Sequence, residues 1–283
     1  MKKEFRSYNV KTIETPTTLE VWEYLNDSVF YTVNVGDKAS MKNEEADNEP
    51  EIYDINNLSA GEHYDALKRK QKHYEEMRWV IARIVDCNFD DNTKFMTLTF
   101  KDNIEDVSVT NYEFSKFIKR LNYHLYHVKK QYLQYLAIWE KQKRGAIHYH
   151  IIFFALPFIS AKVIQDIWGH GFIRINKIDV DSKDNRGRYV SKYFSKVIDE
   201  KSYKQKSFFK SQNLLMPITK RMTQYELFDF SNENVVFSKT YSRKVPDFNN
   251  PLNLGTEDIS FKASTVRYTR IRKEENDYVS EFS

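Results

Sequence analysis

Two apolar, aromatic-rich runs constrain the fold of this 283-residue chain more than any other feature, Tyr132–Glu140 and Ala146–Phe154. Only the sequence Lys-Gln-Lys-Arg-Gly separates them, so they predict a β-hairpin with a basic loop. Further upstream, Phe95–Phe100 alternates bulky apolar residues with threonine, in the period-two manner of a half-buried strand. These segments predict the core of an antiparallel sheet.

Helical patterns alternate with these strands. Tyr112–Tyr126 predicts a helix that packs on the sheet, because its apolar residues recur at helical spacing: Phe114, Phe117, Ile118, Leu121 and Leu125. We expect further helices at Ile164–Trp168 and Tyr189–Ile198, and a strand at Phe172–Val180. The order strand, helix, hairpin, helix, strand, helix predicts an α+β fold, in which helices pack on a central antiparallel sheet.

The hydrophobic content of 41% suffices for one substantial core, so we expect one main domain with two extensions. Residues 1–77 form an N-terminal extension without an assigned function, and residues 78–200 hold the core domain. Residues 201–283 form a basic, aromatic C-terminal region.

The start of that C-terminal region has a distinctive composition. Between Lys201 and Arg221 the chain has six lysines and arginines and no acid, interleaved with Tyr203, Phe208 and Phe209. The pattern suits DNA binding, in which cations contact phosphates and rings stack on bases. It suits equally well a solvated segment with buried aromatic side chains.

Charge and cysteine content narrow the class of protein. The net charge of +4 permits nucleic-acid binding without requiring it. The first residues lack the apolar core of a signal peptide, and the longest apolar run, Ile151–Ile159, is too short to cross a bilayer. The single cysteine, Cys87, excludes an internal disulfide and the paired thiolates of structural zinc sites. We therefore expect a cytoplasmic protein with no membrane partner.

Two histidines in the second strand of the hairpin point to a metal site. Because side chains alternate between the faces of a strand, His148 and His150 share one face. A symmetric loop over Lys141–Gly145 would pair Glu140 with Ala146 and bring a third ligand diagonally next to His148. A register change of one residue would turn Glu140 away.

Two imidazoles and one carboxylate leave coordination positions open, as a catalytic site requires. Oxygen-rich phosphate substrates favour Mg²⁺ or Mn²⁺ there, and Zn²⁺ is compatible with the same ligands. A His-x-His pattern in a strand is also compatible with structural or surface histidines.

The segment Tyr-Val-Ser-Lys-Tyr-Phe-Ser-Lys carries the best candidate nucleophiles. Its Tyr189, Lys192, Tyr193 and Lys196 fall on one stripe of a helix. A tyrosine hydroxyl with a pKa of about 10 is protonated at neutral pH, so it attacks a phosphodiester only with the help of a nearby cation. An exposed helix face with long lysine side chains would show the same stripe.

Together these segments resemble the rolling-circle replication initiators of the HUH endonuclease superfamily, in particular the phage gene A protein-like branch with twin tyrosines. Phe95–Phe100 resembles the first family motif, Trp139–Phe153 the second and Tyr189–Lys196 the third, in the family's order. Ile167–Ile178 also resembles that branch. The resemblance covers about residues 78–200.

The resemblance implies a metal-dependent enzyme that nicks and rejoins DNA. It assigns roles to seven residues, as metal ligands His148, His150 and Glu140, as nucleophiles Tyr189 and Tyr193, and as assisting lysines Lys192 and Lys196. One tyrosine would cleave single-stranded origin DNA, keep the 5′ phosphate and leave a 3′ hydroxyl for a host polymerase. The sequence has no Walker-type phosphate loop, so we expect a host helicase as a further partner.

Three other functions fit parts of the pattern. A non-catalytic module for single-stranded nucleic acid shares this α+β architecture. A relaxase or a single-tyrosine transposase shares the histidine pair, although relaxases usually place the tyrosine before the histidines. A metallohydrolase with an activated water would need no tyrosine. Neither the first-acting tyrosine nor the oligomeric state follows from the sequence.

Overall fold

The computed structural model describes residues 2–35, 60–142, 144–178, 208–247 and 260–273. Its helices and antiparallel sheets confirm the predicted α+β fold class. Among the described residues, no helix is long and apolar enough to cross a membrane.

The chain divides into two compact units. Unit 1 combines residues 1–56 with residues 217–283, and unit 2 holds residues 57–216. The two ends of the chain share unit 1 because strands from both ends pair in one sheet. The predicted boundaries at residues 77 and 200 therefore do not coincide with the units, since hydrogen bonds between distant strands leave no local sequence signal.

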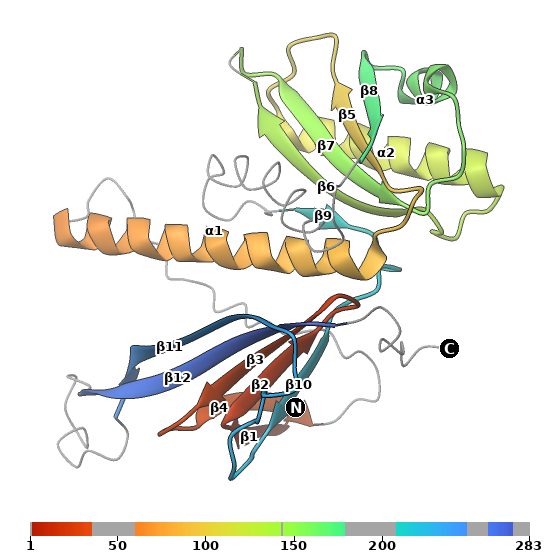
Figure 1. Cartoon of the computed structure of the whole chain (residues 1–283). Coiled ribbons are helices and arrows are strands. Elements are labelled where there is room, and N and C mark those ends of the chain that lie inside the picture. The colour runs from red at the N-terminus through yellow and green to blue at the C-terminus, as the bar shows by residue number, and fades with distance from the viewer. Residues whose placement is uncertain (1, 36–59, 143, 179–207, 248–259, 274–283) are drawn as a thin grey trace. The chain divides into compact units, whose positions relative to one another are not determined.

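Unit 2 is built on a five-stranded antiparallel sheet with the order β8-β5-β7-β6-β9 (Figure 1). The strands are β5 (Lys94–Thr99), β6 (Gln134–Lys141), β7 (Ile147–Phe154), β8 (Ile173–Lys177) and β9 (Phe209–Lys210). Strand β7 carries both histidines and lies between β5 and β6, so side chains of two neighbouring strands flank each histidine.

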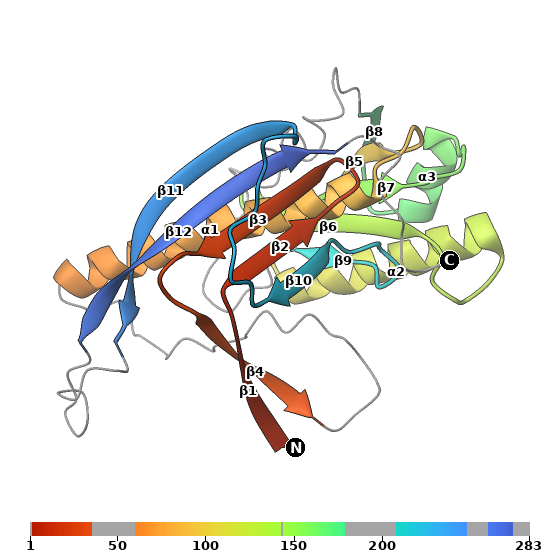
Figure 2. The ribbon, with the colours of Figure 1, turned by 60° about the horizontal axis from the view of Figure 1, so that its bottom comes forward.

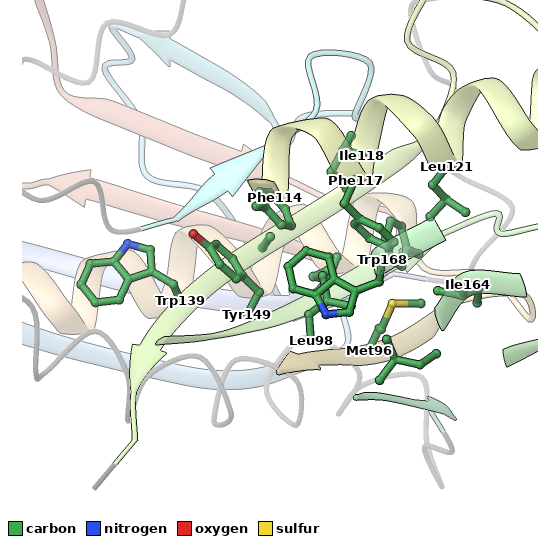
Figure 3. Packing of buried hydrophobic residues seen from close by; sticks show 14 of the residues in the cluster. Met96, Leu98, Phe114, Phe117, Ile118, Leu121, Trp139, Tyr149, Ile164 and Trp168 are labelled. Atoms are coloured by element: carbon green, nitrogen blue, oxygen red, sulfur yellow. The ribbon is translucent and has the colours of Figure 1, made fainter. Parts of the chain in front are cut away.

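Two helices cover one face of this sheet, α2 (Val107–Tyr126) and α3 (Ala161–Trp168). Asp106 caps α2 by accepting from the backbone N–H groups of Ser108 and Val109. Between sheet and helices lies an apolar cluster in which the rings of Phe114 and Tyr149 stack with centroids 4.5 Å apart (Figure 3). The cluster fixes the side of β7 that carries Tyr149, so the histidines lie on the opposite side.

The opposite face of the sheet packs against helix α1 (Ala60–Asn88). Ile81, Ile84 and Val85 of α1 form an apolar cluster with four sheet residues, Leu136, Ile138, Ile152 and Phe154. This second cluster shares its face with the histidine pair. Two side chains of this cluster, Ile152 and Phe154, come directly after the histidines on the same face of β7. Their packing against α1 therefore helps to position the histidine strand.

The β6–β7 hairpin is confirmed, but its predicted register is wrong. Glu140 stands directly opposite His148, not opposite Ala146. The connection again has five residues, but it begins one residue later than expected, after Lys141. Within it, the N–H of Gly145 donates to the carbonyl of Gln142 (2.8 Å) and Gly145 adopts a φ of +89°. The register moves by two residues, an even number, so Glu140 keeps the face that it was predicted to share with His148.

Unit 1 contains a second five-stranded antiparallel sheet with the order β10-β2-β3-β12-β11, and the separate ribbon β1-β4 (Figure 2). The strands are β1 (Lys2–Tyr8), β2 (Val10–Glu14), β3 (Thr18–Tyr24), β4 (Val29–Val35), β10 (Ile218–Met222), β11 (Val235–Pro246) and β12 (Phe261–Arg272). A buried carboxylate joins both ends of the chain, because the guanidinium of Arg267 donates to Glu23 through Nε and Nη2. Such a two-point pair specifies how β12 aligns with β3.

Candidate metal centre on the unit 2 sheet

Three predicted metal ligands meet on one face of the unit 2 sheet. His148 and His150 project from β7, and Glu140 faces His148 from the neighbouring strand β6. On the other side, β5 places Thr99 opposite His148 and Thr97 opposite His150. Direct cross-strand pairs bring their Cβ atoms to within roughly 5 Å, so these side chains can act on a shared ligand.

Three neighbours hold the imidazole of His150. Its Nε2 lies 2.8 Å from Oε1 of Glu140, and its Nδ1 lies 3.1 Å from the hydroxyl of Thr97. The ring also stacks on Phe95, with centroids 5.6 Å apart and an interplanar angle of 19°. Contacts at both nitrogens and at one ring face orient the imidazole before any ligand binds.

His148 is held differently. The residue is only 8% exposed, and its Nε2 is buried without a hydrogen-bond partner in the described part of the chain. A buried polar atom without a partner costs on the order of 1–3 kcal/mol, and such atoms are rare in folded proteins. A bound ion would remove this cost, because Nε2 of the neutral imidazole can offer it a lone pair. His148 shares its sheet face with Glu140 and His150.

The electrostatics of the site favour the protonation states that bind metals. Burial lowers the pKa of His148, as do the neighbouring His150 and Arg144, and Glu140 opposes them in part. The hydrogen bond from His150 lowers the pKa of Glu140, together with the charges of the two imidazoles and against the effect of burial. A neutral His148 and an ionised Glu140 at neutral pH are the forms that ligate a divalent cation.

Within the residues that the structure describes, no three His, Cys, Asp or Glu side chains surround one point at ligand distance. Glu140 contacts His150 directly instead. The donor set nevertheless fits a divalent ion, because two imidazoles and one carboxylate share one face of the sheet. In the described part of the chain, Nε2 of His148 has no hydrogen-bond partner. Ligation by both residues requires that the hydrogen bond between Glu140 and Nε2 of His150 opens.

The predicted nucleophiles Tyr189 and Tyr193, with Lys192 and Lys196, lie outside the described residues. Their roles stay predictions.

The basic, aromatic segment that starts at Lys201 is described only in part. Phe208 and Phe209 are half-buried and pack against the two clusters of unit 2. These two rings therefore act in packing, as the second interpretation of that segment expected. The predicted DNA contact of the C-terminal region stays a prediction.

Sequence reasoning missed the contacts that orient His150. The alternation in Phe95–Phe100 already places Phe95 and Thr97 on one face of a strand. The missing information was the pairing of β5 with β7, which joins residues more than 50 positions apart in the chain. A pairing over that distance follows from the whole sheet and not from a local pattern.

Comparisons with known proteins agree with the motifs. Residues 93–198 match the model of a protein family whose description begins "Replication-associated protein ORF2". The "Phasyl DNA replicon protein arp" of Escherichia coli is 27% identical over 157 residues, which is 47% of this chain and 53% of that protein. This chain thus spans about half the length of that relative. No solved structure matches the chain.

The matched span contains both the histidine pair and the two tyrosines. The central region of the chain therefore resembles the replication-associated proteins of that family, as its motifs predict.

Proposed function

We propose that the chain initiates rolling-circle replication by nicking and rejoining single-stranded origin DNA in a metal-dependent reaction with a phosphotyrosine intermediate. The observation that carries the proposal is the convergence of Glu140, His148 and His150 on one sheet face, where the Nε2 of His148 is buried and unpartnered among the described residues. The family match supports the role in replication.

His148, His150 and Glu140 would hold Mg²⁺ or Mn²⁺. Bound there, the ion would offset the charge that develops on the scissile phosphate and align its phosphorus for attack. The protein's own contribution is orientation, since Thr97 and Phe95 fix the plane of the His150 imidazole. The face also carries apolar side chains of the second cluster, which limit access of water.

The reaction exchanges one phosphodiester for another. The hydroxyl oxygen of Tyr189 or Tyr193 attacks the phosphorus and loses its proton, while the 3′ oxygen of the preceding nucleotide leaves and takes up a proton. The 5′ phosphate stays on the tyrosine, and Lys192 or Lys196 stabilises the phenolate and the phosphate oxygens. Attack by a later 3′ hydroxyl reverses the exchange and circularises the strand. A host polymerase would extend the free 3′ hydroxyl, and a host helicase would open the duplex.

The test is formation of a covalent protein–DNA adduct. We expect the full chain with Mn²⁺ to capture a single-stranded fragment from the DNA that encodes it, as a band that survives denaturing electrophoresis. Mass spectrometry should find the nucleotide on a tyrosine, and EDTA should abolish the adduct. Binding of every fragment without an adduct would instead support the non-catalytic module, and turnover without an adduct would support a metallohydrolase.

Thr97 gives a smaller and more specific prediction. Its hydroxyl can donate to Nδ1 of His150 or accept from it, and by accepting it would support the tautomer that leaves Nε2 free for a metal ion. Thr97→Val keeps the shape of the side chain and removes both options. We expect it to weaken Mn²⁺ binding by roughly tenfold, the lower end of the effects measured for residues that orient a metal ligand. A titration that follows free Mn²⁺ by electron paramagnetic resonance measures this.

Thr97→Ser is the matched variant, because it keeps the hydroxyl, and we expect nearly wild-type affinity for Mn²⁺. Equal affinities of the valine and serine variants would show that Thr97 only packs in the sheet.

A further inference from the structure

An exposed aromatic ring and an arginine lie one strand away from the histidine strand, at the edge of the sheet that the described residues form. Strand β8 is the edge strand next to β5 (Figure 1). Its Arg174 pairs with Thr97, and the carbonyl of Phe172 accepts a hydrogen bond from the N–H of Thr99 (2.9 Å). Thr97 and Thr99 are the two residues that face the histidines on β7. Across the three strands, Phe172 thus lines up with Thr99 and His148, and Arg174 lines up with Thr97 and His150.

The side chains of Phe172 and Arg174 point to the histidine face. Ile173 and Ile175 pack into the apolar cluster under α2 and α3, on the other face of the sheet. Since side chains alternate along an extended strand, the residues at positions 172 and 174 project to the opposite side. This is the side of His148 and His150.

The backbone at Phe172 is held close to β5, although the side chain of Phe172 is exposed. The backbone of Gly171, with a φ of +151°, passes so close to β5 that a Cβ atom there would clash with the carbonyl oxygen of Thr99. This close approach fixes where the next residue stands. Phe172 is nevertheless 62% exposed, and Arg174 beside it is exposed as well. An exposed aromatic ring next to a cation offers the two contacts that single-stranded DNA uses, stacking on a base and binding of a phosphate.

Positive charge continues around the histidines. Arg144, on the loop between β6 and β7, donates to the carbonyl of Phe100 (3.2 Å), at the end of β5. Its guanidinium is close enough to His148 to influence that imidazole electrostatically. Arg144 thus adds a second positive charge to that of Arg174 on β8.

We propose that Phe172 and Arg174 form a binding site for single-stranded DNA that leads the strand to the histidine pair. A base stacks on the ring of Phe172, and Arg174 binds an adjacent phosphate, with Arg144 available for a further one. Stacking on an aromatic ring tolerates every base, and arginine binds phosphate in two-point fashion. The inference rests on the proposed function, because it takes DNA as the substrate of the neighbouring metal centre.

Binding without cleavage tests this site separately from catalysis. The probe is fluorescein-labelled oligothymidine of roughly 20 nucleotides, longer than the site of a single-stranded binding fold. Fluorescence anisotropy in EDTA measures its affinity for the full chain. We expect Phe172→Ala to weaken binding by roughly tenfold and Phe172→Trp to restore it. Arg174→Ala should reduce the slope of log affinity against log salt by about 0.7, the value for one phosphate contact on a single strand.

Matched controls come from the same unit. Phe158 is 97% exposed and follows the far end of β7, and Lys162 is an exposed cation in α3. Phe158→Ala and Lys162→Ala should leave affinity and salt slope unchanged. Because all four positions are exposed, none of these variants is expected to unfold the protein.

Each outcome bears on one proposal. Unchanged oligothymidine affinity in both Phe172→Ala and Arg174→Ala overturns the DNA site, whether or not the wild type forms an adduct. This result is expected if the surface binds a protein partner instead. Weaker binding in the two variants, without loss in the controls, supports the site even if no adduct forms. If the variants bind DNA more weakly and no adduct forms, only the proposed nicking reaction is contradicted.

Discussion

Replacement of His148 by alanine is expected to abolish Mn²⁺ binding and, with it, formation of the covalent DNA adduct. The imidazole would supply one of the two proposed nitrogen ligands, so its loss should exceed the roughly 10- to 100-fold effect of residues that only orient a ligand. Calorimetric titration with Mn²⁺ measures the first effect, and capture of single-stranded DNA measures the second.

The same variant should hardly destabilise the metal-free protein. Alanine leaves a cavity at a residue that is 8% exposed, but it also removes a buried nitrogen without a partner in the described part of the chain. These effects have opposite signs. We therefore expect Tm to change little without metal, while the rise of Tm on addition of Mn²⁺ disappears, because only the wild type binds the ion.

Ile152→Ala is the matched control for His148→Ala. Ile152 is fully buried on the same strand and the same face, in the cluster with α1. Its truncation should cost roughly 2–5 kcal/mol of unfolding free energy and leave Mn²⁺ affinity unchanged in the folded protein. A His148→Ala variant with wild-type Mn²⁺ affinity, or one that loses as much stability as Ile152→Ala, would remove His148 from the metal centre.

The part of the site that lies within one hairpin could be predicted from the sequence. Alternation of side chains along a strand depends only on the backbone, so His148 and His150 could be assigned to one face. The partner of Glu140 could not be assigned, because it depends on where the turn begins, and the connection follows Lys141 instead of Glu140. The predicted face of Glu140 is nevertheless correct, because the register moved by an even number of residues.

Contacts between distant segments could not be predicted. Thr97 meets His150, and Phe172 stands beside Thr99, only because β5 pairs with β7 on one side and with β8 on the other. The pairing of β12 with β3 joins the two ends of the chain in the same way. Local periodicity indicates that a segment is a strand, but the burial of its side chains in the whole sheet decides which strand lies next to it.

The second large effect concerns the nucleophile. Tyr189→Phe/Tyr193→Phe is expected to abolish the covalent adduct while Mn²⁺ binding and oligothymidine binding stay at wild-type levels. Phenylalanine keeps the ring and removes only the hydroxyl oxygen that would attack phosphorus. His148→Ala should lose both adduct and Mn²⁺, so the two variants separate the nucleophile from the metal centre. Each single variant should keep adduct formation in part, because the other tyrosine would lie one turn away on the predicted helix.

Tyr149 is the matched control for this experiment, because it is the tyrosine nearest to the histidines in sequence. Its side chain is fully buried on the other face of the sheet, and its hydroxyl donates to Oδ1 of Asn111 (2.7 Å). Burial also raises the pKa of its phenol, which makes the phenolate harder to form. Tyr149→Phe should therefore leave the adduct intact. A full adduct in the double variant would exclude Tyr189 and Tyr193 as the nucleophiles. Because Tyr149 is buried, the nucleophile would then have to be a different, exposed tyrosine.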